Sequence, residues 1–286
     1  MTGWDVMGNL VRVARKEFSD LTSSTLMLII LIWYFIQFLI VVYTHVYPFD
    51  GMPSLISYYD NPAELFFSDF AIMLCKNGSI LGIVLGFVSV ASEVDGHALN
   101  ILLMKPLYRD TVINGKLLGV IGFILCLFCF TAFLFIMALS LYSVFILDAH
   151  APGSLSVYLS TFVSYLPLAL VLSLLCILLT YSITLLMCQV FKNQSLALFL
   201  SLFIWVILFV LMDNVLLAGN VGFFAGRAAQ DFIASLSPYN MVGSILSERD
   251  LYGALAYRRS QFFTLFLYCF VALVLSYIAF LRRDIS

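Results

Sequence analysis

The charged residues best placed for chemistry are Glu93, Arg109 and Lys116, which lie in one polar segment between two strongly apolar runs. A carboxylate and basic groups in such a segment are suited to ion pairs and charge-assisted hydrogen bonds. Lys105 adds a third basic residue, and the positive-inside tendency then places the segment, residues 93–116, on the cytoplasmic side. We therefore expect it to face the cytosol and to bind another protein.

Apolar residues recur within this segment at helical spacing, at Val94, Ala98, Ile101 and Leu102, and Pro106 ends the pattern. A short amphipathic helix is predicted to project from the membrane, with Ile101 and Leu102 as its apolar contact. A solvated loop remains the alternative for the charged residues, because exposed ion pairs contribute little.

Composition identifies a polytopic membrane protein. The chain has 286 residues, of which 63% are hydrophobic and 10% are charged. Its net charge of −2 indicates neither a nucleic-acid footprint nor a polybasic lipid patch. The charged N-terminal region does not resemble a cleavable signal peptide, so the first span is expected to direct insertion. Residues 1–24 predict a cytosolic amphipathic helix that lies at the membrane interface.

Six apolar runs are predicted to cross the membrane as helices, since about 20 apolar residues span a bilayer. The fourth is expected to follow a short external helix that ends near Tyr165, and to be kinked at Pro167. A coupling loop at 92–116 would be cytosolic and a loop at 218–261 external, with both termini inside. The predicted spans in the domain 25–286 are 25–43, 70–91, 117–147, 167–190, 196–217 and 262–281.

Glycines recur every four residues in the second span, at Gly78, Gly82 and Gly86. Such a ridge favours close helix packing, within the chain or in a dimer, and a role in lining a pathway is the alternative. Lys76 and Asp213 are isolated charges at matching depth in spans two and five. They either pair or extend independently to the lipid headgroups.

Known catalytic motifs are absent from the sequence, including the GxxxxGK[ST] phosphate loop and HExxH. No ionisable pair lies at midplane depth, so energy for transport would come from a partner. Cys126 and Cys129 share one helical face, but no further ligand completes a metal site, and ordinary packing is favoured. The sequence predicts neither catalysis nor a metal site in this chain.

Glu93, Gly96, the Lys-Pro pair at 105 and 106, Arg109 and the Gly-Lys pair at 115 and 116 together resemble the first cytoplasmic loop of ABC-2 type permeases. ARKEFSD at 14–20 is similar to their N-terminal elbow, and SLSPYNMVGSIL at 235–246 to their last external region. The resemblance implies an all-α ABC-2 fold, similar to type V exporters, with six spans, an elbow helix and a cytosolic coupling helix.

The resemblance further implies a dimer, with itself or a close paralogue, that works as an exporter in the cell membrane with a separate ATPase subunit. ATP and Mg²⁺ would bind to that subunit. The resemblance implies a coupling role for Glu93, Gly96, Pro106, Arg109 and Lys116. His97 departs from the Gly-Thr pattern that is usual in the family at positions 96 and 97. The chain looks most similar to the permeases of copper-maturation exporters for nitrous-oxide reductase.

Two rival functions remain open at this point. One is a membrane anchor that couples an ATPase to a mechanical or signalling change without translocation, and the other is a carrier independent of ATP. Co-purification of an ATPase and transport into vesicles distinguish the three. The sequence does not identify the substrate.

Overall fold

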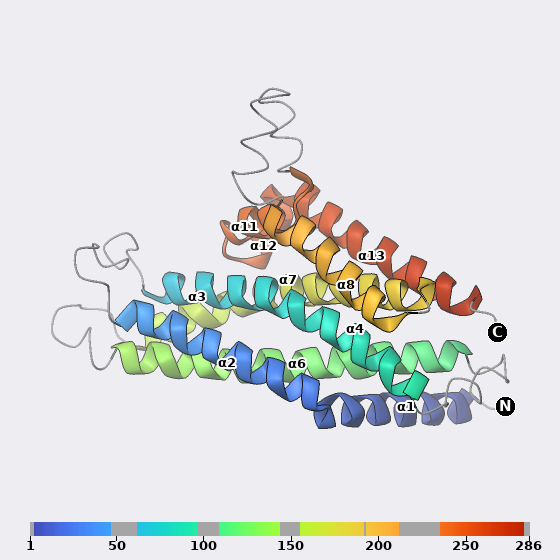
Figure 1. Cartoon of the computed structure of the whole chain (residues 1–286). Helices are drawn as coiled ribbons and strands as arrows, with labels where there is room; N and C mark the ends of the chain where they lie inside the picture. The colour runs from blue at the N-terminus through green and yellow to red at the C-terminus, as the bar shows by residue number, and fades with distance from the viewer. Residues whose placement is uncertain are drawn as a thin grey trace.

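The computed structural model describes residues 3–46, 62–95, 109–143, 155–191, 193–211 and 235–282. All its described elements are helices, so the predicted all-helical fold is confirmed for this part of the chain. Figure 1 shows the long helices side by side, with α1 beginning and α13 ending at the same end of the bundle. The elements are α1 (Gly3–Ser23), α2 (Thr25–Val46), α3 (Pro62–Ile72), η2 (Met73–Asn77), α4 (Gly78–Asp95), α6 (Arg109–Tyr142), α7 (Leu155–Val190), α8 (Gln194–Val206), η5 (Ile207–Leu211), α11 (Pro238–Leu246), α12 (Leu251–Tyr257) and α13 (Arg259–Arg282).

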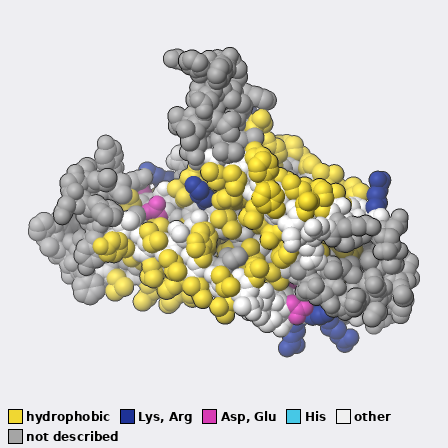
Figure 2. Space-filling view, viewed as in Figure 1, with side chains coloured by type: hydrophobic (Ala, Val, Ile, Leu, Met, Phe, Trp, Pro, Cys, Tyr) yellow, Lys and Arg dark blue, Asp and Glu magenta, His cyan; other side chains and the backbone are white. Residues whose placement is uncertain are grey.

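Five of the described helical stretches are long and apolar enough to cross a membrane. A sixth apolar stretch, Gln194–Val210, is shorter and ends one residue before the described residues 193–211 end. Hydrophobic side chains cover much of the face seen in Figure 2, while charged side chains gather near α1. The five long stretches are Thr25–Thr44, Ala63–Val90, Thr111–Tyr142, Leu155–Val190 and Arg259–Phe280.

The central element is α7, which contacts α3, α4, α6, α8 and α13. It continues through Pro167 without a break, so the predicted division into an external helix and a separate span is wrong. Proline removes one backbone hydrogen bond, a cost that tertiary packing can offset. Phe162, Leu168 and Ala169, on both sides of the proline, are fully buried against neighbouring helices.

The second span begins earlier than predicted, because α3, η2 and α4 follow one another without interruption from Pro62 to Asp95. Proline is favoured in the first turn of a helix, and Glu64 places an acidic group there. The aromatic residues that follow, Phe66, Phe67 and Phe70, are buried, and the Phe70 ring centre lies 5.3 to 5.6 Å from those of Phe128, Phe135 and Phe162. Residues 62–69 therefore continue into the second span as one helix, where the sequence predicted an external loop that could hold a short helix from Pro62 to Phe67.

One further boundary differs from the sequence predictions. The third span was expected from residue 117, but α6 already begins at Arg109, so the segment between α4 and α6 is shorter than the predicted loop 92–116. The stretch 235–246, which resembles the last external region of ABC-2 permeases, contains α11. Ser237 is its N-cap, accepting a hydrogen bond from the Asn240 amide at 3.4 Å, and Pro238 occupies its first turn.

Candidate functional site

The structure places three of the predicted coupling residues, Glu93, Arg109 and Lys116, at the end of the bundle where α4 ends and α6 begins. Glu93 lies in the last turn of α4, and Arg109 is the first residue of α6. Lys116 lies two turns farther along α6. The other four predicted coupling residues, Gly96, Ile101, Leu102 and Pro106, lie outside the described residues.

Lys116 is buried and connects three helices. Its ammonium donates hydrogen bonds to the backbone oxygen and the hydroxyl of Ser89 in α4, at 2.6 and 3.0 Å. It also lies 3.5 Å from Oε2 of Glu17 in α1, and the side chains of Lys116 and Glu17 are each only 8% exposed. We call these three residues the Lys116 joint. Lys116 was predicted from the sequence, whereas Glu17 and Ser89 were not.

Glycines in α6 bring α1 close enough to form this joint. A Cβ atom added at Gly115 would lie 2.6 Å from the side chain of Val13, and one at Gly119 would lie 2.9 Å from the backbone oxygen of Ala14. Small residues spaced by four allow such an approach. The spacing of this glycine pair is visible in the sequence, but the contact that it makes was not predicted.

Successive residues of α1 contact successive residues of α6, so the two helices run side by side in the same direction. Val13 lies against Gly115 and Glu17 against Gly119, while the rings of Phe18 and Phe123 are 6.2 Å apart. Figure 1 accordingly shows α1 running lengthwise beside α6. The predicted N-terminal helix is present over Gly3–Ser23, and its position in the membrane interface stays a prediction.

A second close contact holds α4 against α7. A Cβ atom at Gly82 would meet the Thr180 hydroxyl and lie 2.5 Å from the Ile177 backbone oxygen, and one at Gly86 would lie 2.9 Å from the Tyr181 backbone oxygen. Gly78 makes a looser contact with Ile177. The glycine ridge therefore packs within the chain, and a role at a dimer interface or along a pathway stays a prediction.

At the other end of the molecule, two π-helical segments lie beside α11. Lys76 is in η2, and its ammonium lies 4.9 Å from the centre of the Tyr239 ring. In the other segment, η5, the Leu208 oxygen accepts a hydrogen bond from the Ser237 hydroxyl at 3.3 Å. Such segments often mark functional sites. The predicted Lys76 partner, Asp213, lies outside the described residues.

Spans two and five are joined there by one side-chain hydrogen bond, in which the Trp205 indole donates to the Ser79 hydroxyl at 2.7 Å. We expect Ser79→Ala to lower the free energy of unfolding by about 1 to 2 kcal/mol, because the indole N–H loses its acceptor. Ser173→Ala is a matched control, since Ser173 is equally buried but bonds only to its own helix, through the Leu170 oxygen. Unfolding in detergent would measure both, and equal losses would contradict the prediction.

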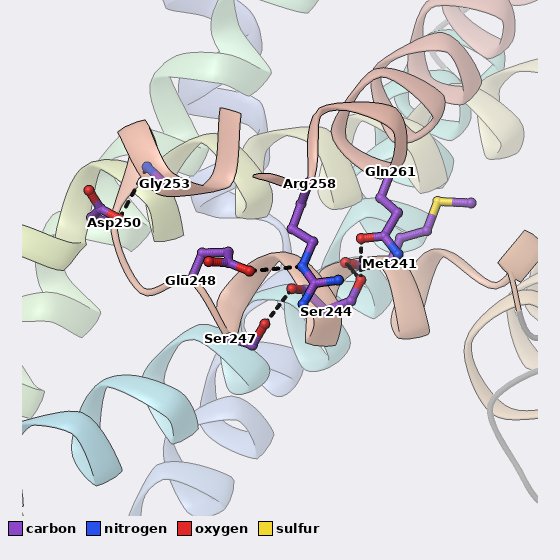
Figure 3. A network of polar contacts seen from close by, with 8 residues as sticks. All are labelled: Met241, Ser244, Ser247, Glu248, Asp250, Gly253, Arg258 and Gln261. Carbon is purple, nitrogen blue, oxygen red and sulfur yellow. Dashed lines mark hydrogen bonds and ion pairs between the residues drawn. The ribbon is translucent and has the colours of Figure 1, made fainter. Parts of the chain in front are cut away.

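Polar contacts fix α11 and α12 to the start of α13 (Figure 3). Arg258 donates to Glu248 at 2.9 Å, and the Ser244 hydroxyl donates to Gln261 in α13 at 2.7 Å. Arg249, whose φ is 66°, pairs with Glu64 at the start of α3. These contacts make the region around α11 and α12 a structured cap over this end of the spans.

The described cysteines are free, and Cys126 and Cys129 are exposed on α6. In the described part of the chain, no group of three or more His, Cys, Asp or Glu residues could hold a metal ion. The geometry of the Lys116 joint is that of a buried ion pair that connects helices.

The long apolar helices define a multi-pass membrane protein. The chain belongs to the ABC-2 family of transporter proteins, because the model of that family, described as "ABC-2 family transporter protein", matches residues 11–285. It is therefore a permease component of an ABC transporter, a class that is typically non-catalytic and associates with an ABC ATPase subunit. Among proteins of curated function, none matches this sequence.

Proposed function

We propose that two copies of this chain form the membrane part of an ABC exporter in the cell membrane, with two separate ATPase subunits docked on residues 93–116. ATP and Mg²⁺ would bind to the ATPases, and both termini of this chain would be cytosolic. The observation that carries this proposal is the Lys116 joint. It ties together α4 and α6, the two helices that flank the proposed docking segment, and adds α1 as a third.

Closure of the ATPases would push on the segment between Glu93 and Arg109, with Ile101 and Leu102 as its apolar contact. Because Lys116 bonds to Ser89, α6 and α4 would move together. The close packing of α4 on α7 at Gly82 would pass this motion to the centre of the bundle. The arrangement thus supports a rigid transmission of force from the docking segment to the spans.

The finer assignment rests on the resemblance of the chain as a whole to permeases of the copper-maturation exporters for nitrous-oxide reductase. We propose that this chain acts in a related exporter. Transport into inside-out vesicles containing the chain and its ATPase would test this assignment. ATP hydrolysis without accumulation of any cargo would favour a mechanical or signalling role instead.

Replacing Ile101 and Leu102 together with Asp is expected to leave membrane insertion intact and to reduce recovery of the ATPase severalfold. The reason is that charged side chains would replace the proposed apolar contact. Pull-down of the tagged chain from membranes measures this recovery, and Ser247→Asp, an exposed position on the cap, is the control. Undiminished recovery from the double variant would show that the ATPase docks elsewhere.

Sidedness is tested by impermeant thiol labelling in a background that lacks the native cysteines. Ser154→Cys and Ser247→Cys are expected to react from outside the cell, whereas Asn100→Cys is not. Ser247 is exposed in the cap, so its lack of reaction would not reflect burial. Reaction at Asn100 alone would reverse the topology and remove the proposed docking side.

A further inference from the structure

A cavity of about 280 Å³ lies beside the Lys116 joint, between α6 and α13, and no proposed step of transport uses it. Its walls come from the first turns of α6, the end of α4 and the last turns of α7 and α13. Over its length, α13 packs mainly on α7. The cavity therefore occupies a wedge that the surrounding lipid leaflet can reach.

The lining of the cavity changes in character along the helices. Near the helix ends it is mixed, with the side-chain amides of Asn114 and Gln189 and the hydroxyl of Tyr277 beside apolar side chains such as Ile113 and Phe280. Farther from the ends it is apolar, with Phe270 and Val274 of α13, which are 54% and 38% exposed. A lipid in this leaflet has the same order, because its polar group lies at the surface and its chain lies deeper.

The polar part of the lining offers hydrogen bonds rather than a charge. Lys116 also lines the cavity, but its ammonium is already engaged by Glu17 and Ser89. The Gln189 side-chain oxygen is buried and has no hydrogen-bond partner among the described residues. Rotation about the last torsion of this side chain exchanges its oxygen and nitrogen, so the amide can accept from a ligand or donate to it. A hydroxyl group, which also does both, matches such an amide.

We propose that this cavity binds a neutral, single-chain amphiphile of the surrounding leaflet. Its hydroxyl head would bond to the amides of Asn114 and Gln189, and its chain would lie along Phe270 and Val274. The volume supports one chain rather than two, since it is close to the lower end of the roughly 300 to 1,000 Å³ typical of ligand pockets. The proposal goes beyond transport and requires no ATPase.

The test uses the full-length chain in phosphatidylcholine nanodiscs and a monoacylglycerol with a diazirine in its chain. After illumination, we expect crosslinks in peptides from α13 and the end of α7. Val274→Trp, which fills the cavity, is expected to reduce this labelling at least fivefold. Leu275→Trp is the matched control, because Leu275 is 48% exposed on the same helix and does not line the cavity. Equal labelling of the two variants would overturn the site.

Two further arms test the nature of the head group. The same probe with both hydroxyls converted to methyl ethers is expected to crosslink about fivefold less, because it cannot donate to Gln189. Gln189→Leu should remove this difference while it leaves the ether probe unaffected. Stronger labelling by a diazirine fatty acid than by the monoacylglycerol would contradict a neutral head. A negative result in these labelling experiments would not change the result expected from the ATPase pull-down. The lipid site and the transporter function are therefore tested separately.

Discussion

Replacing Lys116 with methionine is expected to lower the free energy of unfolding by about 3 to 5 kcal/mol, because it leaves the Glu17 carboxylate buried without its counter-charge. Both side chains are only 8% exposed, so water cannot solvate the carboxylate that remains. Glu17 Oε1 already lacks a hydrogen-bond partner in the described structure. Loss of the Lys116 ammonium beside Oε2 is therefore more costly. Unfolding in mixed detergent micelles, followed by circular dichroism, measures the loss.

The double variant Glu17→Gln with Lys116→Met should recover part of this loss, since no charge stays buried. Arg258→Met is the control, because its partner Glu248 forms a more exposed pair, with side chains 41% and 24% exposed. That substitution should cost at most about 1 kcal/mol. Strictly additive losses at Glu17 and Lys116 would show that the two do not interact.

Gly82→Ala is the substitution with the second large expected effect. It is expected to lower the free energy of unfolding by about 1 to 3 kcal/mol or more. The added methyl group would lie 2.5 Å from the Ile177 backbone oxygen, and a backbone atom cannot move aside as the end of a side chain can. The helices α4 and α7 would have to separate along their contact. We also expect the variant to couple ATP hydrolysis to transport less efficiently. The amount of cargo transported per ATP hydrolysed would measure this coupling.

Gly243→Ala supplies the control, because nothing lies within 4 Å of a Cβ atom at that position. Gly243 lies within α11, where alanine is favoured over glycine by about 0.5 to 1 kcal/mol. The control should therefore be neutral or slightly stabilising. If Gly82→Ala behaved in the same way, the close packing of α4 on α7 would be refuted.

The apolar runs were sufficient to predict that the chain is helical and spans a membrane, because about 20 apolar residues have few other stable arrangements. Their ends were predicted poorly. Residues 62–69 were assigned to an external loop with at most a short helix from Pro62, because acidic residues without Lys or Arg are typical of such a loop, although Glu64 in the first turn also favours a helix N-terminus. Pro167 was interpreted as a break because local sequence does not show the packing that keeps the helix continuous.

The candidate site was predicted in part. Lys116 stood out as a charge beside an apolar run, but its partner Glu17 is distant in sequence and lies on a helix whose charges are typical of a solvated face. Lys76 was recognised as unusual, whereas its contact with the Tyr239 ring depends on how α11 folds back on the spans. Such long-range pairs cannot be predicted from one sequence, although the spacing of Gly78, Gly82 and Gly86 did indicate a close helix contact.

The packing of α1 on α6 also has a consequence for the order of events during synthesis. Glu17 precedes Lys116 by 99 residues (116 − 17), and ribosomes add roughly 5 to 20 residues per second, so α1 exists for roughly 5 to 20 s before its partner is made. During that time α1 can contact only the elements made before α6, which include its neighbours α2 and α4. Its packing on the glycines of α6 forms once the third span is made, so the helix that is synthesised first completes its packing only later.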